Sequence, residues 1–134
     1  KTKLLTICLL LFTSQVFADD INTNIKKLNS LNSCESCNLK GANLSGAYLT
    51  NANLKYTNLT NANLIDANLS GANLISANLA NANLSGAHLA NANLSVADLS
   101  GADLKDSFLV NAKIGGAILC NTNTPWGIDN TGCK

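Results

Sequence analysis

The chain of 134 residues is long enough for one domain and too short for two of ordinary size. Charged residues make up 13% of it and aromatic residues 4%, whereas 46% of its residues are hydrophobic, so a core must consist mostly of leucine and alanine. All nine basic residues are lysines, and the absence of arginine removes the side chain best suited to bidentate phosphate binding, so nucleic acid is not an expected partner.

Residues 1–18 have the features of a secretory signal peptide. Two lysines precede an apolar run at 4–12, and the small residue Ala18 precedes Asp19. The run has fewer than half of the roughly 20 apolar residues that a membrane span requires. We therefore expect an exported chain that begins at Asp19, lies in the periplasm or outside a bacterial cell, and has no membrane span. Its seven lysines and eight acidic residues give a net charge of −1.

Residues 19–36 are predicted to form an N-terminal cap that contains a short helix. Their apolar residues share one helical stripe, at Ile21, Ile25, Leu28 and Leu31. Asp19 or Asp20 is placed to cap the start of this helix, which predicts an amphipathic helix over about 20–30. The helix is expected to cover the end of the segment that follows.

Residues 37–121 repeat a five-residue pattern. Leucine recurs at every fifth position from Leu39 and is replaced once, by Ile114. When the leucine position is called i, position i−2 is alanine in 14 of 17 repeats, position i−1 is asparagine in ten, and position i+2 is glycine or asparagine in 12. An α-helix would turn by about 500° per repeat and scatter the leucines around its surface, so a helix is excluded.

An extended backbone accounts for the same pattern. Residues i−2 and i point to the same side of a strand, so alanine and leucine are buried together. The next inward residue comes three positions later, which requires a bend in every repeat, and glycine or asparagine at i+2 tolerates the left-handed backbone of such a bend. We therefore predict short extended sides joined by corners around a leucine–alanine interior. The asparagines at i−1 are expected to hydrogen-bond along the stack.

The repeats from 42–46, ANLSG, to 102–106, ADLKD, resemble the A(D/N)LXX signature of pentapeptide-repeat proteins. The resemblance implies an all-β fold, a right-handed quadrilateral β-helix with four repeats per coil. Seventeen repeats would form just over four coils, about 20 Å long at the usual spacing of neighbouring strands. The flanking segments also resemble those of family members. Residues 122–134 are expected to form a C-terminal cap in which Pro125, Trp126 and Gly127 turn the tail back and Trp126 covers the last coil.

Four cysteines remain beyond the signal peptide, an even number for an oxidising compartment. Cys34 and Cys37 would lie at one end of the rod and Cys120 and Cys133 at the other, too far apart for one tetrahedral zinc ion. We predict two disulfides, Cys34–Cys37 and Cys120–Cys133. Redox catalysis by the first pair is disfavoured, because a β repeat follows it in place of the helix that would lower a thiol pKa.

Four repeats per coil would stack residues 20 apart on one face. One outward column at i−1 then contains Tyr48, Asn68, His88 and Phe108, and the neighbouring i+1 column ends in Val110. These three rings on an asparagine-rich surface predict a protein-binding face, and the alternative is that they have no function. His88 is the only histidine, and the serines have no organised His/Asp partner, so no metal, cofactor or catalytic site is expected.

The sequence as a whole predicts an exported, non-enzymatic scaffold that is structural or binds a protein. It does not identify the partner, and homodimers are expected if the caps cover the coil ends incompletely. The alternative is a DNA mimic that inhibits a DNA-binding protein such as gyrase. The near-neutral charge and the export signal disfavour that alternative, because the DNA-mimicking subgroup of the family has an acidic surface and inserted loops.

Overall fold

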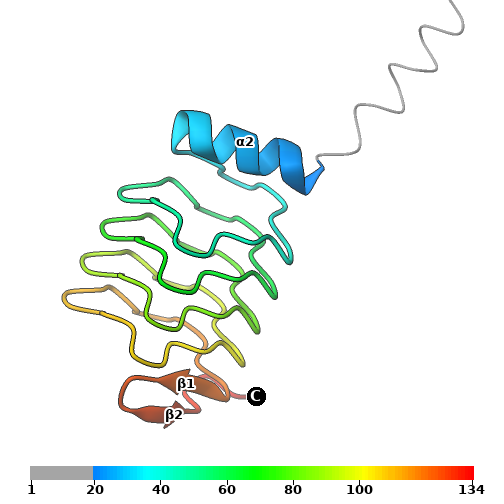
Figure 1. Ribbon diagram of the computed structural model, residues 1–134. Coiled ribbons are helices and arrows are strands. Elements are labelled where there is room, and N and C mark those ends of the chain that lie inside the picture. The colour runs from blue at the N-terminus through cyan, green and yellow to red at the C-terminus, as the bar shows by residue number, and fades with distance from the viewer. Residues whose placement is uncertain (1–19) are drawn as a thin grey trace, which may run out of the picture.

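A computed structural model describes residues 20–134, and the predicted signal peptide lies outside these residues. The described chain begins with the helix α2 (Ile21–Leu31) and ends with two short strands, β1 (Thr122–Thr124) and β2 (Gly127–Asp129). Between them the chain winds into a stack of coils (Figure 1). None of the helices within 20–134 has the length and apolar character needed to cross a membrane.

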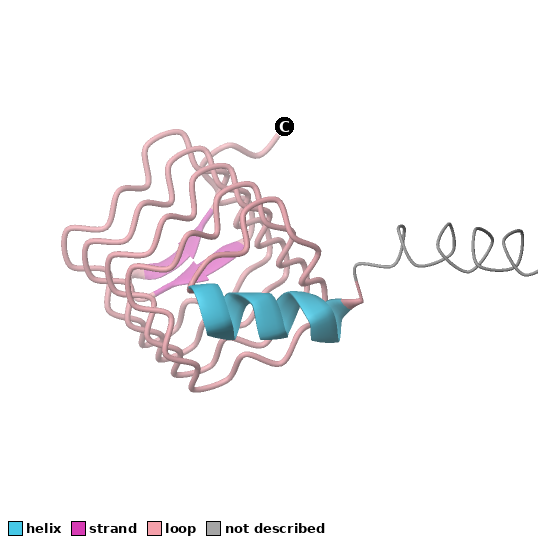
Figure 2. Ribbon diagram, turned by 90° about the horizontal axis from the view of Figure 1, so that it is seen from above, coloured by secondary structure: helices cyan, strands magenta, loops and turns pink. Residues whose placement is uncertain are grey.

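The coil has four sides (Figure 2). Residues at i−1 form parallel bridges with residues 20 positions later, which is four repeats, so each side is one column of repeats. We number the faces by their bridged residues along the chain. Face 1 contains Ser33, Asn53, Asn73, Asn93 and Lys113; face 2 contains Asn38, Asn58, Asn78, Asp98 and Ile118; face 3 contains Asn43, Asn63, Asn83, Asp103 and Asn123; face 4 contains Tyr48, Asn68, His88 and Phe108.

The interior consists of the residues at i−2 and i, as the sequence predicts. Every leucine of the repeats from Leu39 to Leu104 is at most 4% exposed. Burial of each leucine side chain contributes about 1.5–3 kcal/mol. Thr57 lies at an i−2 position, where most repeats have alanine. Its buried hydroxyl has a hydrogen-bond partner, because it donates to the carbonyl of Cys34 at 2.6 Å. The core is therefore a column of leucines and small side chains that runs the length of the stack.

The main-chain hydrogen bonds explain the five-residue period. The N–H of i−1 donates to the previous coil, the N–H groups of i and i+2 donate to the next coil, and the N–H of i−2 closes a corner. The N–H of i+1 has no main-chain acceptor, and the side chain at i−1 accepts it. The repeat 62–66 shows all five bonds. Within the same coil, Ala62 N–H donates to Leu59 O and Ile65 N–H donates to Asn63 Oδ1. Between coils, Asn63 N–H donates to Ala42 O, Leu64 N–H to Asn83 O and Asp66 N–H to Ser85 O.

The asparagine at i−1 thus acts mainly within its own repeat, and the predicted ladder of bonds along the stack is wrong for most repeats. Asn83 Oδ1 accepts the N–H of Ser85 at 3.0 Å, and an aspartate does the same where Asp98 accepts from Ser100. A bond along the stack is formed in the last coil, where Asn123 donates to an aspartate at 2.9 Å. The amide oxygen is needed because the backbone leaves one donor per repeat without an acceptor.

The corners are type II turns, and the predicted position of the bend is confirmed. The carbonyl of residue i accepts the N–H three residues later, and residue i+2 has a φ between 54° and 71° in every repeat. Glycine and asparagine adopt this conformation readily. Tyr56 and Val96 adopt it at 59° and 60°, where a non-glycine side chain costs about 1–2 kcal/mol.

Helix α2 lies across the N-terminal end of the coil (Figures 1 and 2). It begins one residue later than predicted, after Asp20, whose carboxylate accepts the N–H of Asn22. Leu28 is 1% exposed and joins the core, and the side chain of Asn24 donates to the carbonyl of Asn38 at 2.9 Å. The helix therefore covers the first coil with both apolar and polar contacts.

The helix passes directly into the coil. Asn32 ends it in the left-handed conformation, and its carbonyl accepts the N–H of Asn53 on face 1. Parallel bridges run from Ser33 to Asn123, beyond the expected 37–121 at both ends. Cys34 and Thr124 fill the leucine position i in these outer repeats, and both are buried. Neither is leucine, so the repeat motif did not mark them, although each lies five residues from a leucine of the pattern.

The C-terminal tail reverses direction instead of continuing the coil. Strand β1 extends face 3, and β2 pairs with it antiparallel after a turn at Pro125 and Trp126. The prediction that Trp126 covers the last coil is wrong, because this side chain lies at the tip of the turn and is 61% exposed. The tail then passes below face 2, where the carbonyl of Thr131 accepts the N–H of Leu119 at 2.7 Å.

Asp129 helps to hold this tail in place. The hydroxyl and the backbone N–H of Thr131 hold the pKa of Asp129 below its usual value. A lowered pKa in the folded state means that the carboxylate stabilises the fold above its unfolded-state pKa. This contribution is lost as the pH falls through the lowered value.

The role of the i−1 amide can be tested with one pair of substitutions. Asn63→Ala leaves the N–H of Ile65 without its acceptor, and we expect a loss of about 1 kcal/mol in the free energy of unfolding, measured by urea denaturation. Tyr48→Ala changes the same repeat position where no such bond exists and should be nearly neutral. Equal losses for the two variants would contradict the account.

Candidate functional site

The residues predicted for a binding face come together on face 4. Tyr48, Asn68, His88 and Phe108 are joined in sequence by parallel bridges, and Val110 is the last i+1 residue beside them. Tyr48 is 90% exposed, Phe108 53% and Val110 66%, and His88 is also exposed. We call these five residues the aromatic face.

Two rings of the aromatic face stack on one another. His88 and Phe108 lie one coil apart, and their ring centroids are separated by 4.7 Å with an angle of 25° between the planes. Tyr48 is separated from His88 by the coil of Asn68, whose Oδ1 accepts the N–H of Ser70 at 3.1 Å. The face therefore presents a stacked pair of rings and, two coils away, a third ring that is almost completely exposed.

The rings occupy positions where the fold favours asparagine. Because Tyr48, His88 and Phe108 have no oxygen placed to accept the N–H of i+1, three main-chain donors have no acceptor within the described chain; they belong to Thr50, Ala90 and Val110. The other repeats without asparagine or aspartate at i−1 lie in the first and last coils, at Ser33, Lys113 and Ile118. Each lost hydrogen bond costs about 1 kcal/mol, so the rings are not explained by the stability of the fold.

Of the other exposed apolar side chains, Tyr56, Val96 and Ile128 were not singled out from the sequence, whereas Trp126 was expected to cover the last coil. Tyr56 and Val96 are 51% and 62% exposed at a corner of face 1, and the ammonium group of Lys55 lies 4.7 Å from the centre of the Tyr56 ring. Trp126 and Ile128 are about equally exposed in the tail. The sequence did carry a signal for the first two, because each places a large apolar residue at i+2, where glycine or asparagine predominates.

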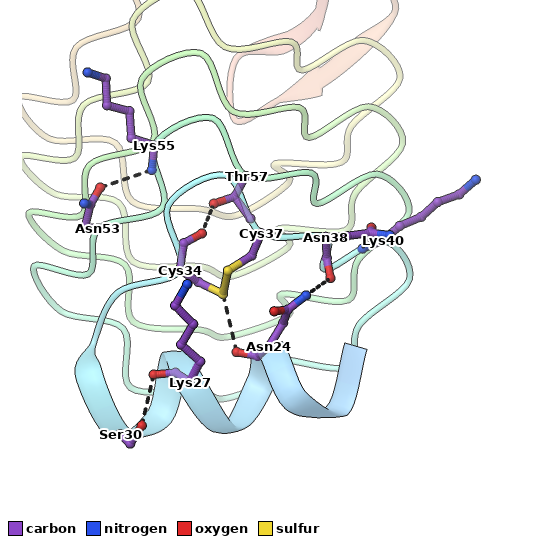
Figure 3. Close-up of a disulfide and its surroundings, with 10 residues drawn as sticks. All are labelled: Asn24, Lys27, Ser30, Cys34, Cys37, Asn38, Lys40, Asn53, Lys55 and Thr57. Atoms are coloured by element: carbon purple, nitrogen blue, oxygen red, sulfur yellow. Dashed lines mark hydrogen bonds between the residues drawn. A yellow bond between two sulfur atoms is a disulfide. The ribbon is translucent and has the colours of Figure 1, made fainter. Parts of the chain in front are cut away.

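The structure places the two expected cysteine pairs at disulfide distance. Cys34 and Cys37 bridge the first corner inside the core, with Cα atoms 5.3 Å apart and exposures of 0% and 5% (Figure 3). Cys34 occupies a position i and Cys37 the next i−2. The carbonyl oxygen of Asn24 lies 3.4 Å from the Cys34 sulfur, so helix α2 covers this pair. The pair therefore lies within the first coil, at its contact with helix α2.

The second pair connects the tail to the last coil. Cys120 and Cys133 have Cα atoms 4.7 Å apart, Cys133 is exposed and Cys120 is partly buried. A disulfide between them would close a loop that contains β1 and β2. In the chain-entropy model a loop of this length contributes about 3 kcal/mol, and the bond would hold the tail against face 2.

The remaining polar groups have structural roles. Ser100 donates its hydroxyl to Asp98 at 2.6 Å, and Ser95 donates to Asn93 at 2.7 Å, each within its own repeat. Within residues 20–134 no three histidine, cysteine or carboxylate side chains form a group that could hold a metal ion. The same residues enclose no pocket for a small molecule.

Comparisons with known proteins agree with this architecture. The family model for eight copies of pentapeptide repeats matches residues 33–66, 67–106 and 92–123. The chain is similar to the solved structure of a pentapeptide repeat protein from Nostoc PCC 7120, with 32% identity over 69% of this chain and 74% of that one, and a TM-score of 0.52. No curated protein sequence matches the chain.

A second similar structure is a pentapeptide repeat protein from the thylakoid lumen of Arabidopsis thaliana. It is 28% identical over 66% of this chain, with a TM-score of 0.50, and the chain spans 66% of its length. Together these likenesses support the right-handed β-helix for the coil described above.

The burial of the two cysteine pairs predicts how they respond to thiol reagents. Alkylation of unfolded, unreduced protein purified from an oxidising compartment should label none of the four cysteines. Mild reduction of the folded protein should expose Cys120 and Cys133 to alkylation before the buried pair, as measured by peptide mass spectrometry. Labelling of all four cysteines without reductant would reject the disulfide assignment.

Proposed function

Because the chain belongs to the pentapeptide-repeat family, we propose that it is an exported, non-enzymatic scaffold that binds a protein partner through the aromatic face. The observation that supports this function most directly is the replacement of i−1 asparagine by three exposed rings on one face. Each ring leaves a main-chain N–H without the side-chain acceptor that asparagine supplies in other repeats. We therefore expect the rings to serve a contact outside the fold.

The chemistry of the aromatic face suits a protein surface. Exposed aromatic side chains bury a large area with little loss of conformational freedom, and they are enriched at the centres of protein interfaces. The stacked rings of His88 and Phe108 hold each other in place, which lowers the entropy cost of binding. Asn68 and the neighbouring hydroxyl groups of Thr50 and Ser70 would supply polar contacts at the edge of the same surface.

Three observations support export. Both cysteine pairs lie at disulfide distance, and disulfides persist in oxidising compartments such as the periplasm or the extracellular space. A similar structure belongs to a protein of the thylakoid lumen, which is also reached by translocation across a membrane. The features at residues 1–18 that predict a signal peptide agree with this location.

A protein partner is favoured over DNA mimicry by the distribution of charge. A DNA mimic requires a continuous acidic surface that reproduces the spacing of phosphates. The acidic side chains of the repeats are spread over different faces and corners, and lysines lie among them. Glu35 lies on face 1, Asp98 on face 2, Asp103 on face 3, and Asp66 and Asp106 at the corner between faces 3 and 4.

The proposal is tested by replacing the rings with the residue that the fold favours. The triple variant Y48N/H88N/F108N should keep or raise the melting temperature, because each asparagine can accept the N–H of i+1, and it should abolish binding. Binding is measured with a photo-crosslinking residue in place of Ser70, on face 4, in the native exported compartment. We expect crosslinks from this position in the wild-type background and their loss in the triple variant.

Two controls distinguish specific binding at face 4 from non-specific binding elsewhere on the protein. The same photo-crosslinking residue in place of Ser85, on face 3, should give no crosslink to the same partner. The variant Y56N/V96N removes exposed apolar side chains from face 1 and should leave crosslinking from position 70 unchanged. Crosslinks that survive the triple substitution, or that are equally strong from position 85, would show that the aromatic face is not the binding site.

A further inference from the structure

The C-terminal end of the coil is covered on one half only. The tail lies below face 2, and β2 lies beside β1 on face 3, because the chain reverses at Pro125 and Trp126. Continuation of the coil would instead have placed residues 128 and 133 below faces 4 and 1. The last repeats on those faces, 107–111 and 112–116, therefore have no strand below them.

The uncovered half is an open strand edge. Five N–H groups that would donate to a next coil have no acceptor within the described chain; they belong to Asp106, Leu109, Asn111, Ile114 and Gly116. The carbonyls of Ser107 and Ala112 likewise accept no main-chain bond. In the coil above, the equivalent groups are all paired, as in Leu89 N–H to Phe108 O at 2.8 Å and Phe108 N–H to Ala87 O at 2.9 Å. This row of donors and acceptors fits another extended backbone.

Most of the inward side chains at this edge and two of its outward side chains are apolar. Leu109, Ala112 and Ile114 point inward but are only partly buried, in contrast to the fully buried leucines of the coils above. Phe108 and Val110 are exposed on the outside of the same edge. An added strand would therefore cover apolar surface on its inner and its outer side.

A second copy of the chain fits this edge poorly. The N-terminal end of a copy is closed by α2, which excludes head-to-tail stacking. A coil of 20 residues has a perimeter of at most about 66 Å and a main-chain cross-section of at most about 270 Å², against about 800 Å² per partner in a typical stable interface. Two rigid ends would also leave the outward Phe108 and Val110 uncovered, whereas a flexible extended segment can contact them.

We propose that this open edge binds an extended polypeptide segment as an additional parallel strand. The segment would place an aromatic residue outward against Phe108, the next residue, leucine or isoleucine, inward against Leu109, and a second aliphatic residue five positions later against Ile114. Its carbonyls would accept from Leu109, Asn111, Ile114 and Gly116, and its N–H groups would donate to Ser107 and Ala112. The proposal goes beyond the binding function of the aromatic face, because it depends on the backbone edge and the apolar residues of the last coil and shares only Phe108 and Val110 with that face.

The test uses a peptide with the sequence of residues 105–116, KDSFLVNAKIGG, with blocked ends. In the protein this segment already pairs with residues 85–96 in the required register. Hydrogen exchange of the full chain is followed by NMR with and without the peptide. We expect the amides of Leu109, Asn111, Ile114 and Gly116 to exchange rapidly in the free protein and at least about tenfold more slowly with saturating peptide, which corresponds to about 1.4 kcal/mol.

A matched control peptide is methylated on the main-chain nitrogens of its phenylalanine and second lysine, the two donors to Ser107 and Ala112. It should give no protection. The variant Y48N/H88N leaves the edge intact. The unmodified peptide should therefore still slow hydrogen exchange at the same four amides of this variant, even if the aromatic face has no partner. Equal protection by the methylated peptide, protection at other amides, or protection that appears without peptide as the protein concentration rises would each overturn the proposal.

Discussion

Each five-residue repeat presents five main-chain N–H groups, and the other main-chain atoms of the coil satisfy only four of them. Three donate to neighbouring coils and one closes the corner, while the N–H of i+1 requires a side-chain oxygen two residues earlier. An unpaired amide in a partly buried wall is costly, which explains asparagine or aspartate at i−1 on most repeats. The corner, the inward leucine and this side-chain bond together make five residues the natural unit of the fold.

The same constraint separates the surface that the fold requires from the surface that we propose for binding. On faces 1, 2 and 3 the asparagine side chains of the inner coils are occupied by the backbone. On face 4 three of the four i−1 positions carry rings, and these side chains form no hydrogen bond to the N–H of i+1. The ends are separated in a similar way: α2 closes the first coil, whereas the last coil is closed below faces 2 and 3 and open below faces 4 and 1. The two surfaces that we propose for binding thus lie where main-chain groups lack partners in the fold.

Much of the architecture could be predicted from the sequence, because each inward or corner residue obeys a local rule. Leucine and alanine marked the interior, and glycine or asparagine at i+2 marked the corners. The partner of the i−1 amide could not be predicted, since it depends on which N–H groups the coil leaves free. Cys34 and Thr124 were missed because they fill leucine positions with other side chains. The exposed Trp126 and the open edge follow from a chain reversal that the motif does not encode.

The central claim is that the side chain at i−1 protects the N–H of i+1. Ala80 and Ala90 provide a matched pair, because both are partly buried alanines at i+1, one beside Asn78 and the other beside His88. Asn78 Oδ1 accepts the N–H of Ala80 at 3.0 Å, whereas the N–H of Ala90 has no acceptor within the described chain. Native-state hydrogen exchange should therefore be slower at Ala80, by a factor on the order of five or more for a bond of about 1 kcal/mol. Equal exchange rates at the two amides would contradict the account.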